Sequence, residues 1–451
     1  MFKSFNIRKK IYYLSDTIKR KNVSNHLKEI NFILNNPESN KSKIIQKSNL
    51  NNILNHATNT TPFYKKFRNF DSILDFPVIK KLVIQDNFNE FQSYPHKDKN
   101  NFKVSTSGST GVPFFLFQDE VKRNRNKADV LHFLKRSNYE VGHRLFYLGV
   151  RLNQKFSLKS LIQNVSLIDI SKLTDKAIED FLEKVAKDKN SNKILLGHVS
   201  AFETILKYLD RKNKDITNIK LNSIITNSEH LSVETKTKLE NYFNTPALSR
   251  YSSEEAGIIA HQTIDSPDTF VVNHASYYIE VLNLNNNTPV KPGEIGRIVL
   301  TDLFNYAMPL IRYDTGDIAK TKVCDNGSIQ FESVEGRKMD LVYDTQGNVL
   351  SSYVFNKIIY KHYKKIKQYQ FIQQDKKEYE IKLNLQEDKF PFEKELISEV
   401  KEDFGKDANV NITYVNEIPP LASGKRRKVI NNYNKNNSLI NPALSKHESI
   451  T

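Results

Sequence analysis

In the middle of the chain, hydrophobic residues first recur at the spacing of a helix, and short apolar runs with the length of strands come after them. Ile178, Phe181, Leu182 and Val185 recur at intervals that place them on one face of a helix. Thr174 stands just before this segment, where its hydroxyl can cap the first turn. The pattern therefore predicts an amphipathic helix that begins after Thr174 and packs one apolar face against a core.

Short apolar runs and further helical segments then follow in alternation. The runs have the length of buried strands, and small polar residues stand where the helices should begin. This alternation predicts a parallel sheet with helices on both faces and ligands outside the carboxyl ends of its strands. The expected strands are 193–196, 221–226 and 246–251, and the expected helices are opened by Ser200, at capping-box spacing from Glu203, and by Ser232.

The two ends of the chain have patterns of their own. Residues 1–100 are polar and helical, and short strands with glycine-containing turns run from about 290 to 340. A smaller α+β unit follows, with helices near 352–364 and 393–404 and strands near 367–373, 378–385 and 410–415. We therefore expect an α/β protein with a large domain at 1–339, a small domain at 340–432 and a polar, disordered tail at 433–451.

Charge and composition narrow the function classes without fixing one. The 451 residues carry 68 Lys and Arg against 51 Asp and Glu, a formal net charge of +17 that is spread along the chain. Both a drift in composition and a functional basic surface fit this distribution. No apolar stretch is long enough to span a membrane, the N-terminus lacks a signal-peptide core, and the single Cys324 excludes an internal disulfide. We expect a cytoplasmic protein without a transmembrane segment or a zinc site.

A run of small hydroxyl residues and glycines stands at 105–113. Such residues let the backbone approach a polyphosphate, to which hydroxyl and N–H groups then donate hydrogen bonds. No Gly-Lys-Ser/Thr follows, so the run is not a Walker A loop. The apolar flanks at 102–104 and 114–117 predict that it joins two strands of a hairpin.

Two further segments carry carboxylates next to expected strands. The segment 250–257 reads Arg-Tyr-Ser-Ser-Glu-Glu-Ala-Gly, and its carboxylates would lie at the ligand-binding edge of the sheet, where Mg²⁺ needs oxygen ligands. The segment 309–317 reads Pro-Leu-Ile-Arg-Tyr-Asp-Thr-Gly-Asp and ends in a carboxylate that can accept two hydrogen bonds from a diol. Alone, either segment also fits an ordinary acidic cap or turn.

Two basic segments complete the set. Gly336-Arg337-Lys338-Met339-Asp340 precedes the expected small domain, and Ser423-Gly424-Lys425 leads into a basic run that ends at 428. A lysine after a glycine can reach into a site and neutralise developing negative charge. As isolated segments, they also fit a charged linker and a basic patch for nucleic acid or membrane.

In their order and wording, the five segments resemble those of the adenylate-forming enzymes, the acyl-CoA synthetases and their relatives. The wording of 309–317, the lead-in at 293–303 and the N-terminal segments 56–64 and 76–81 are most similar to the phenylacetate–CoA ligase-like branch, including proteins associated with capsule or surface-polysaccharide synthesis. The chain departs from the family at Phe114, Ser252, Glu254 and Met339. The resemblance implies a large adenylate-forming domain with helix-flanked sheets and a small, mobile α+β C-terminal domain.

The resemblance also implies a role for particular residues. Lys425 and Glu255 would be catalytic, with Glu255 holding Mg²⁺ and Glu254 as a rival ligand. Asp340 would lie at the hinge, and His198 and Tyr251 would line the substrate pocket. The residues implied to bind the nucleotide are Thr106, Ser107, Gly108, Ser109, Thr110, Gly111, Ser228, Glu229, Tyr251, Ser252, Asp317 and Arg337.

The function implied by the resemblance is an ATP- and Mg²⁺-dependent ligase that converts a carboxylic acid to an acyl-adenylate. The acyl group would then pass to CoA, a carrier protein or a sugar amine, and no nucleic-acid partner is expected. A different class also stays open, a basic protein that binds a polyanion or a membrane through 425–428. An adenylate-forming fold that has lost turnover is the third alternative.

Overall fold

The structure is a computed structural model, and it separates into two compact units. The first unit comprises residues 1–315 and 319–334, and the second comprises 316–318 and 335–451. The predicted disordered tail lies outside the described residues from position 434 onward. The structure describes residues 2–97, 99–106, 114–149, 163–170, 173–325, 327–337, 342–350, 352–362, 365–387, 389–419 and 427–433.

The first unit begins with helices, as the sequence predicts. Ser39 caps the third of them by accepting a hydrogen bond from the Ser42 amide, a standard use of a serine at this position. Ile30 and Ile33 of the second helix are fully buried and pack against the helix that follows the hairpin. These helices are α1 (Phe2–Ile18), α2 (Asn22–Asn35), α3 (Asn40–Thr60), α4 (Lys81–Asp86) and α5 (Glu120–Lys135).

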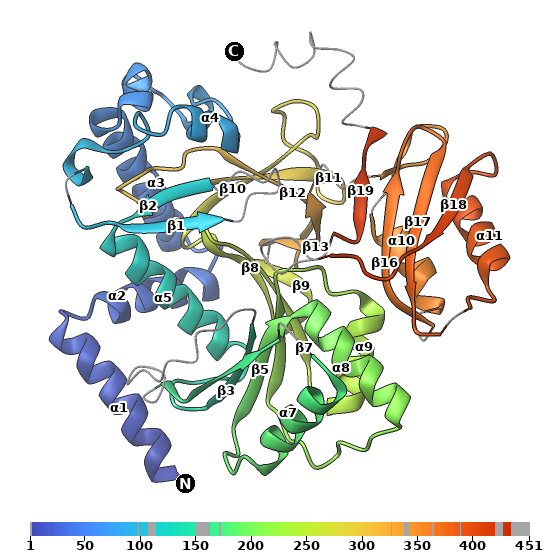
Figure 1. The fold of residues 1–451 in the computed structure, drawn as a ribbon. Coiled ribbons are helices and arrows are strands. Elements are labelled where there is room, and N and C mark those ends of the chain that lie inside the picture. Colours follow the sequence, from blue (N-terminus) through green and yellow to red (C-terminus); the bar gives the residue numbers. More distant parts are fainter. Residues whose placement is uncertain are drawn as a thin grey trace. The chain divides into compact units, whose positions relative to one another are not determined.

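An eleven-stranded sheet forms the centre of the first unit (Figure 1). Its strand order is β10-β11-β12-β13-β9-β8-β7-β6-β5-β3-β4, and the five strands from β7 to β4 are parallel. The parallel strands are β3 (Arg144–Gly149), β4 (Val165–Asp169), β5 (Lys193–His198), β6 (Ser223–Asn227) and β7 (Ala247–Ser253). The others are β8 (Gly257–Thr263), β9 (Ser266–Val272), β10 (Tyr277–Leu282), β11 (Ile295–Asp302), β12 (Tyr313–Val323) and β13 (Ile329–Arg337).

Helices cover both faces of the parallel strands, which confirms the expected layers (Figure 1). One face, with Phe146, Leu195 and Ile224, packs against α7 (Asp175–Lys187), α8 (Val199–Lys212) and α9 (Val233–Phe243). The opposite face carries Leu145, Leu196 and Ile225 and packs against residues of α5. Because side chains alternate along a strand, β3, β4, β5 and β6 each contribute residues to both cores.

Local capping signals predicted two helix starts correctly and one wrongly. Thr174 accepts a hydrogen bond from the Ala177 amide at the start of α7, and Ser232 caps α9. Ser200 does not open α8, because the helix begins at Val199 and His198 occupies the cap position, where its side chain does not cap the helix. The cap comes instead from the carboxylate of Glu229, which accepts a hydrogen bond of 2.7 Å from the Ser200 amide.

The second unit is the predicted small α+β unit. A four-stranded sheet, β18-β17-β16-β19, packs its apolar face against two helices, with Phe355, Phe371, Leu396 and Phe404 fully buried in one core. The predicted bounds of one helix and one strand coincide with those observed. The elements are β14 (Val342–Tyr343), β15 (Val349–Leu350), α10 (Ser352–Lys361), β16 (Ile366–Gln373), β17 (Glu378–Leu385), α11 (Glu393–Phe404), β18 (Asn409–Tyr414) and β19 (Val429–Asn431).

Candidate active site

The predicted phosphate-binding loop is held at both ends by a β-hairpin. Strand β1 (Phe102–Thr106) pairs antiparallel with β2 (Phe114–Gln118), and Thr106 lies opposite Phe114. The hairpin that the sequence predicted around the loop is therefore present. Of the predicted loop residues, only Thr106 is described, whereas Ser107, Gly108, Ser109, Thr110 and Gly111 lie outside the described residues.

Glu255 is the carboxylate that the fold positions most firmly in the acidic segment. Its side chain is buried, and Oε1 accepts a hydrogen bond of 3.0 Å from the hydroxyl of the buried Tyr313. Its backbone carbonyl accepts a hydrogen bond of 3.1 Å from Nε2 of Gln118. The rival Glu254 is exposed. A buried carboxylate that is oriented by a hydroxyl is better suited than an exposed one to hold a cation in one place.

One aromatic pair connects the start of β2 to the tyrosine that binds Glu255. The ring of Phe114, the first described residue after the loop, lies parallel to the ring of Tyr313 with centroids 6.4 Å apart. Tyr313 in turn donates to Glu255. The next residue after Glu255 is also fixed, since the Tyr277 hydroxyl donates to the carbonyl of Ala256. Phe114 is therefore two contacts away from the candidate metal ligand.

Tyr251 joins the acidic segment to the segment at 309–317. Its hydroxyl donates to Oγ1 of Thr315 at 3.4 Å, and Thr315 donates to the carbonyl of Ile298 at 3.0 Å. The ladder between β7 and β8 shifts register between Tyr251 and Ser252, which marks a bulge at the residue that replaces the family's glycine. Bulges change the direction of side chains and are frequent beside active sites.

Most charged groups of the segment 309–317 serve the fold. Arg312 binds both carboxylate oxygens of Glu280, with Nε at 3.0 Å and Nη2 at 2.8 Å. Asp314 pairs with Nη1 of Arg297 at 2.6 Å. Asp317, predicted to bind the ribose, lies further along β12 and is partly exposed. Arg312 and Asp314 are therefore engaged in pairs within the fold, and Asp317 is the carboxylate of the segment that was predicted to be a ligand.

The loop after β6, predicted to contact adenine, has a constrained backbone. Ser228 adopts φ of 70°, a left-handed conformation that is uncommon for a residue with a side chain. Glu229 caps α8, so its carboxylate supports the helix that follows His198. His198 itself ends β5 and is partly buried. The glycine before it allows close strand packing, because a Cβ at Gly197 would lie 2.7 Å from Cβ of Leu148.

Three predicted residues belong to the C-terminal part of the chain and cannot be placed at the site. Arg337 is the last residue of β13, and its side chain lies outside the described atoms. Asp340, predicted to lie at the hinge, and the catalytic candidate Lys425 both lie outside the described residues. Their roles stay predictions from the resemblance.

Three polar residues to which the sequence analysis assigned no role lie toward the same end of the parallel strands. They are Tyr147 on β3, Asn227 at the end of β6 and Arg250 on β7. Buried polar atoms of Asn227 and Arg250 have no hydrogen-bond partner. The available signal was their position, since each is a polar residue at the carboxyl end of an apolar strand.

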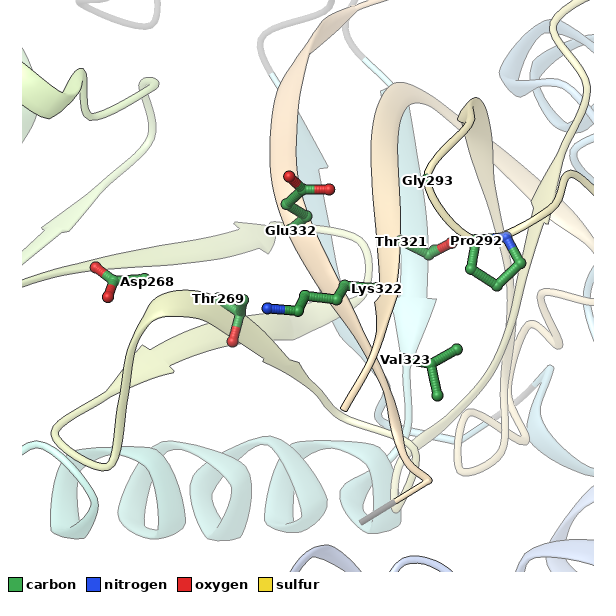
Figure 2. Close-up of a pocket in the computed structure, with 8 residues that line it drawn as sticks. All are labelled: Asp268, Thr269, Pro292, Gly293, Thr321, Lys322, Val323 and Glu332. Carbon is green, nitrogen blue, oxygen red and sulfur yellow. The ribbon is translucent and has the colours of Figure 1, made fainter. Parts of the chain in front are cut away.

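A separate pocket lies on the first unit away from these residues. Figure 2 shows its lining, in which the Lys322 side chain extends toward Thr269. The cavity has a volume of about 570 Å³ and is open to solvent. None of the predicted site residues lines it. The lining residues are Asp268, Thr269, Pro292, Gly293, Thr321, Lys322, Val323 and Glu332.

Comparisons with known proteins agree with this geometry. Residues 342–432 match the family model of the CapK C-terminal domain. Protein CapK of Staphylococcus aureus is 24% identical over 447 residues, which cover 94% of this chain and 93% of that protein. Phenylacetate-coenzyme A ligase of Escherichia coli (strain K12) is 21% identical over 341 residues, which cover 70% of this chain and 75% of that enzyme.

A solved structure decides the fold. The structure of 2-hydroxyisobutyryl-CoA ligase in complex with 2-HIB-AMP, in the postadenylation state, matches 90% of this chain and 93% of that chain with a TM-score of 0.70 at 15% identity. The chain has the fold of the adenylate-forming ligases. The predicted resemblance, the α/β fold class and the ligase class are thereby confirmed. In this adenylate-forming fold, no described helix is long and apolar enough to cross a membrane.

Proposed function

We propose that the chain is an ATP- and Mg²⁺-dependent ligase that activates a carboxylic acid as an acyl-adenylate. The observation that carries the proposal is the set of contacts linking Phe114, Tyr313 and Glu255, together with the hydrogen bond between Tyr251 and Thr315. These contacts join three segments that are far apart in the sequence and that each resemble a family motif. The comparison with 2-hydroxyisobutyryl-CoA ligase, whose structure contains an acyl-AMP, supports the same reaction.

The residues at Glu255 fit a hard cation. Oε1 is bound by Tyr313, and among the described residues no hydrogen-bond donor reaches Oε2. Mg²⁺ is commonly held by one or two carboxylates together with phosphate oxygens, so one available carboxylate oxygen meets the protein's share. A cation there would neutralise charge on the phosphates of the bound nucleotide. Tyr313 fixes the carboxylate, so its orientation does not depend on the ligand.

In the first step, an oxygen of the substrate carboxylate attacks the α-phosphorus of ATP. The bond from this phosphorus to the bridging oxygen breaks, and pyrophosphate leaves with both electrons of that bond. The chain contributes mainly position and charge. The loop at 105–113 would hold the leaving phosphates, Asp317 and Arg337 would orient the nucleotide, and Lys425 would neutralise charge that develops at the α-phosphate.

The acceptor and the biological setting form the finer part of the proposal. A thiol or amine would take the acyl group from the adenylate, with CoA as the first acceptor to test because relatives of the chain are CoA ligases. The similarity to Protein CapK supports a role in surface-polysaccharide synthesis. The proposed domains are 1–339 for ATP and carboxylate binding and 340–432 for the lysine-bearing unit, in a cytoplasmic protein.

Pyrophosphate release tests the proposal. The protein is incubated with ATP, Mg²⁺ and a panel of aryl, fatty, hydroxy and dicarboxylic acids, with and without CoA. Release that requires one of the acids supports adenylation, and a further rise with CoA supports the thioester as product. Silence across the panel, together with salt-sensitive binding to polyanions, would overturn the proposal in favour of the polyanion-binding alternative.

A further inference from the structure

Arg250 is a partly buried arginine that forms no ion pair with any of the described residues. Its Nε and Nη2 atoms are buried without a hydrogen-bond partner. No carboxylate oxygen of the described residues forms a salt bridge with it. Burial lowers the pKa of the guanidinium to about 10, and the nearby Tyr147 phenol acts in the opposite direction. At neutral pH the group is still charged, so the fold carries a buried cation whose solvation it does not replace.

The position of Arg250 in the sheet places it beside the predicted substrate pocket. Ile225 pairs with Leu248, and His198 pairs with Asn227, so Arg250 lies two residues nearer the carboxyl end of β7 than Leu248 does. Side chains two apart on a strand share a face. The next residue, Tyr251, points to the other face and contacts Thr315. The guanidinium therefore lies on the sheet face that carries Ile225, close to the catalytic edge.

Two neighbours complete a polar site around Arg250. The amide of Asn227 lies within hydrogen-bonding reach of the Tyr147 phenol, while its Oδ1 has no partner. Burial raises the pKa of Tyr147, with Glu254 acting in the same direction and Arg250 in the other, so its hydroxyl stays protonated. The three residues together offer a charged fork, a hydroxyl and an amide.

Another arginine of the same protein shows what the two unpartnered atoms of Arg250 can bind. Arg312 uses its own Nε and Nη2 to bind the two carboxylate oxygens of Glu280 at 3.0 and 2.8 Å. This edge of a guanidinium matches a carboxylate in a bidentate, planar pair. In Arg250 the same two atoms are the ones without a partner. The missing group therefore has the shape of a carboxylate.

The other groups facing Arg250 do not supply that charge. His261 lies opposite Arg250 across β7 and β8, and its pKa is held well below the ordinary value by burial and by Arg250. His261 is therefore neutral. Arg136 and His132 also act on His261, and neither can be an anion. None of the described residues therefore supplies the carboxylate, and a ligand can.

We propose that Arg250, with Tyr147 and Asn227, binds a second carboxylate on the acid that the enzyme activates, so that the substrate class is a dicarboxylic acid. The inference rests on the proposed function for the end of the substrate that is adenylated. One carboxylate attacks ATP, and the other pairs with the Nε and Nη2 edge of Arg250. A monocarboxylic acid of the same length leaves the cation unpaired and binds less well.

The test compares matched acids in the wild-type protein and in Arg250→Met. Pyrophosphate release is measured with succinate against butyrate, glutarate against valerate, and phthalate against benzoate. Wild type should prefer the diacid of at least one pair, and Arg250→Met should lower the diacid-to-monoacid ratio of kcat/KM by about 10- to 100-fold, the range for charged hydrogen bonds. Arg250→Lys should keep part of the preference, because the charge remains and the fork is lost.

The control is Arg211→Met on the exposed face of α8, where the arginine pairs with Asp175 at the surface. This variant should retain the wild-type ratio. The proposal is overturned if wild type prefers every monoacid, or if Arg250→Met lowers kcat/KM for diacids and monoacids equally. It is also overturned if Arg250→Met loses as much free energy of unfolding as Arg312→Met, which breaks the pair with Glu280. Arg250 would then have a structural role.

A binding readout separates this inference from the proposed function. If no acid supports pyrophosphate release, the proposed activity fails, and the subsite is judged from the thermal unfolding of wild type and Arg250→Met with each diacid alone. Stabilisation of wild type that the variant lacks keeps the subsite. Equal unfolding temperatures in the two proteins for every diacid refute it.

Discussion

Arg250 on β7 and Arg312, just before β12, are the same residue type, and they differ in the groups that surround them. Arg312 binds Glu280 through Nε and Nη2 and also donates through Nη1 to the carbonyl of Phe76 at 2.9 Å. Arg250 has no partner for the same two atoms. The first arginine joins distant segments of the chain, and the second holds its charge ready on one face of the catalytic edge.

The difference shows how to separate architecture from a binding site in this protein. A charge that stabilises a fold is paired by the fold, because an unpaired buried charge costs several kcal/mol. Such a charge persists where a ligand supplies the partner. Glu255 lies between the two cases, because one oxygen is held by Tyr313 and the other has no donor among the described residues.

The largest expected effect comes from breaking the paired arginine. Arg312→Met leaves the carboxylate of Glu280 and the carbonyl of Phe76 buried without their partner. We expect the free energy of unfolding to fall by about 3–5 kcal/mol, as for other buried pairs that lose one member. Urea unfolding of the purified variants measures it. Arg250→Met should show no such loss, and equal losses in the two variants would remove the comparison.

An intermediate effect is expected from Glu255→Gln. The amide keeps the size of the side chain and can still accept from Tyr313, but it removes the negative charge proposed to hold Mg²⁺. We expect kcat for pyrophosphate release to fall by about 100-fold or more, the range for losing one electrostatic contact at a reacting centre. The unfolding midpoint should change little. Glu254→Gln is the matched control and should retain most of the activity. A larger loss in Glu254→Gln than in Glu255→Gln would favour Glu254 as the ligand.

The smallest effect concerns pH and His261. Its pKa is well below the ordinary value in the folded protein, first because of burial and then because of Arg250. Below about pH 6.5 the unfolded chain binds a proton at His261 that the folded chain does not, so stability falls as the pH falls. Removing the charge of Arg250 should raise the pKa of His261 in the folded protein and so reduce the loss of stability at low pH.

Thermal unfolding between neutral and mildly acidic pH measures the effect. The unfolding temperature of Arg250→Met should decrease less on acidification than that of wild type, with the other histidines common to both proteins. An identical decrease would show that the charge of Arg250 does not reach His261. The comparison between the arginines would then lose its electrostatic support.

Features that depend on neighbours in the sequence were predicted well. Thr174 and Ser232 cap their helices because a cap needs only a hydroxyl within three residues of a free amide. The helix 393–404 and the strand 378–385 have the predicted bounds, since periodicity and turn residues are local signals. The hairpin around the loop at 105–113 was predicted from its apolar flanks in the same way.

Features that depend on distant residues were missed or left open. Ser200 was predicted to cap α8, whereas the cap comes from Glu229, which is brought close by the pairing of β5 with β6. The choice between Glu254 and Glu255 was open in the sequence. The structure favours Glu255, because Tyr313, 58 residues further along, donates to it. Neither contact leaves a trace in the local sequence.

The layers of the fold, the order of the motifs and the class of relatives could be inferred from residue order alone, because they follow from periodicity and from short runs of residues. Which charges are neutralised depends on the folded arrangement of distant segments. Arg250 and Arg312 each precede a tyrosine in the sequence, so their local sequences do not distinguish them. In the fold, Arg312 pairs with Glu280, and the proposed partner of Arg250 is a carboxylate of the substrate. Whether that partner is a carboxylate of the chain or one from outside depends on which strands pair, since a guanidinium is satisfied only by groups within hydrogen-bonding distance.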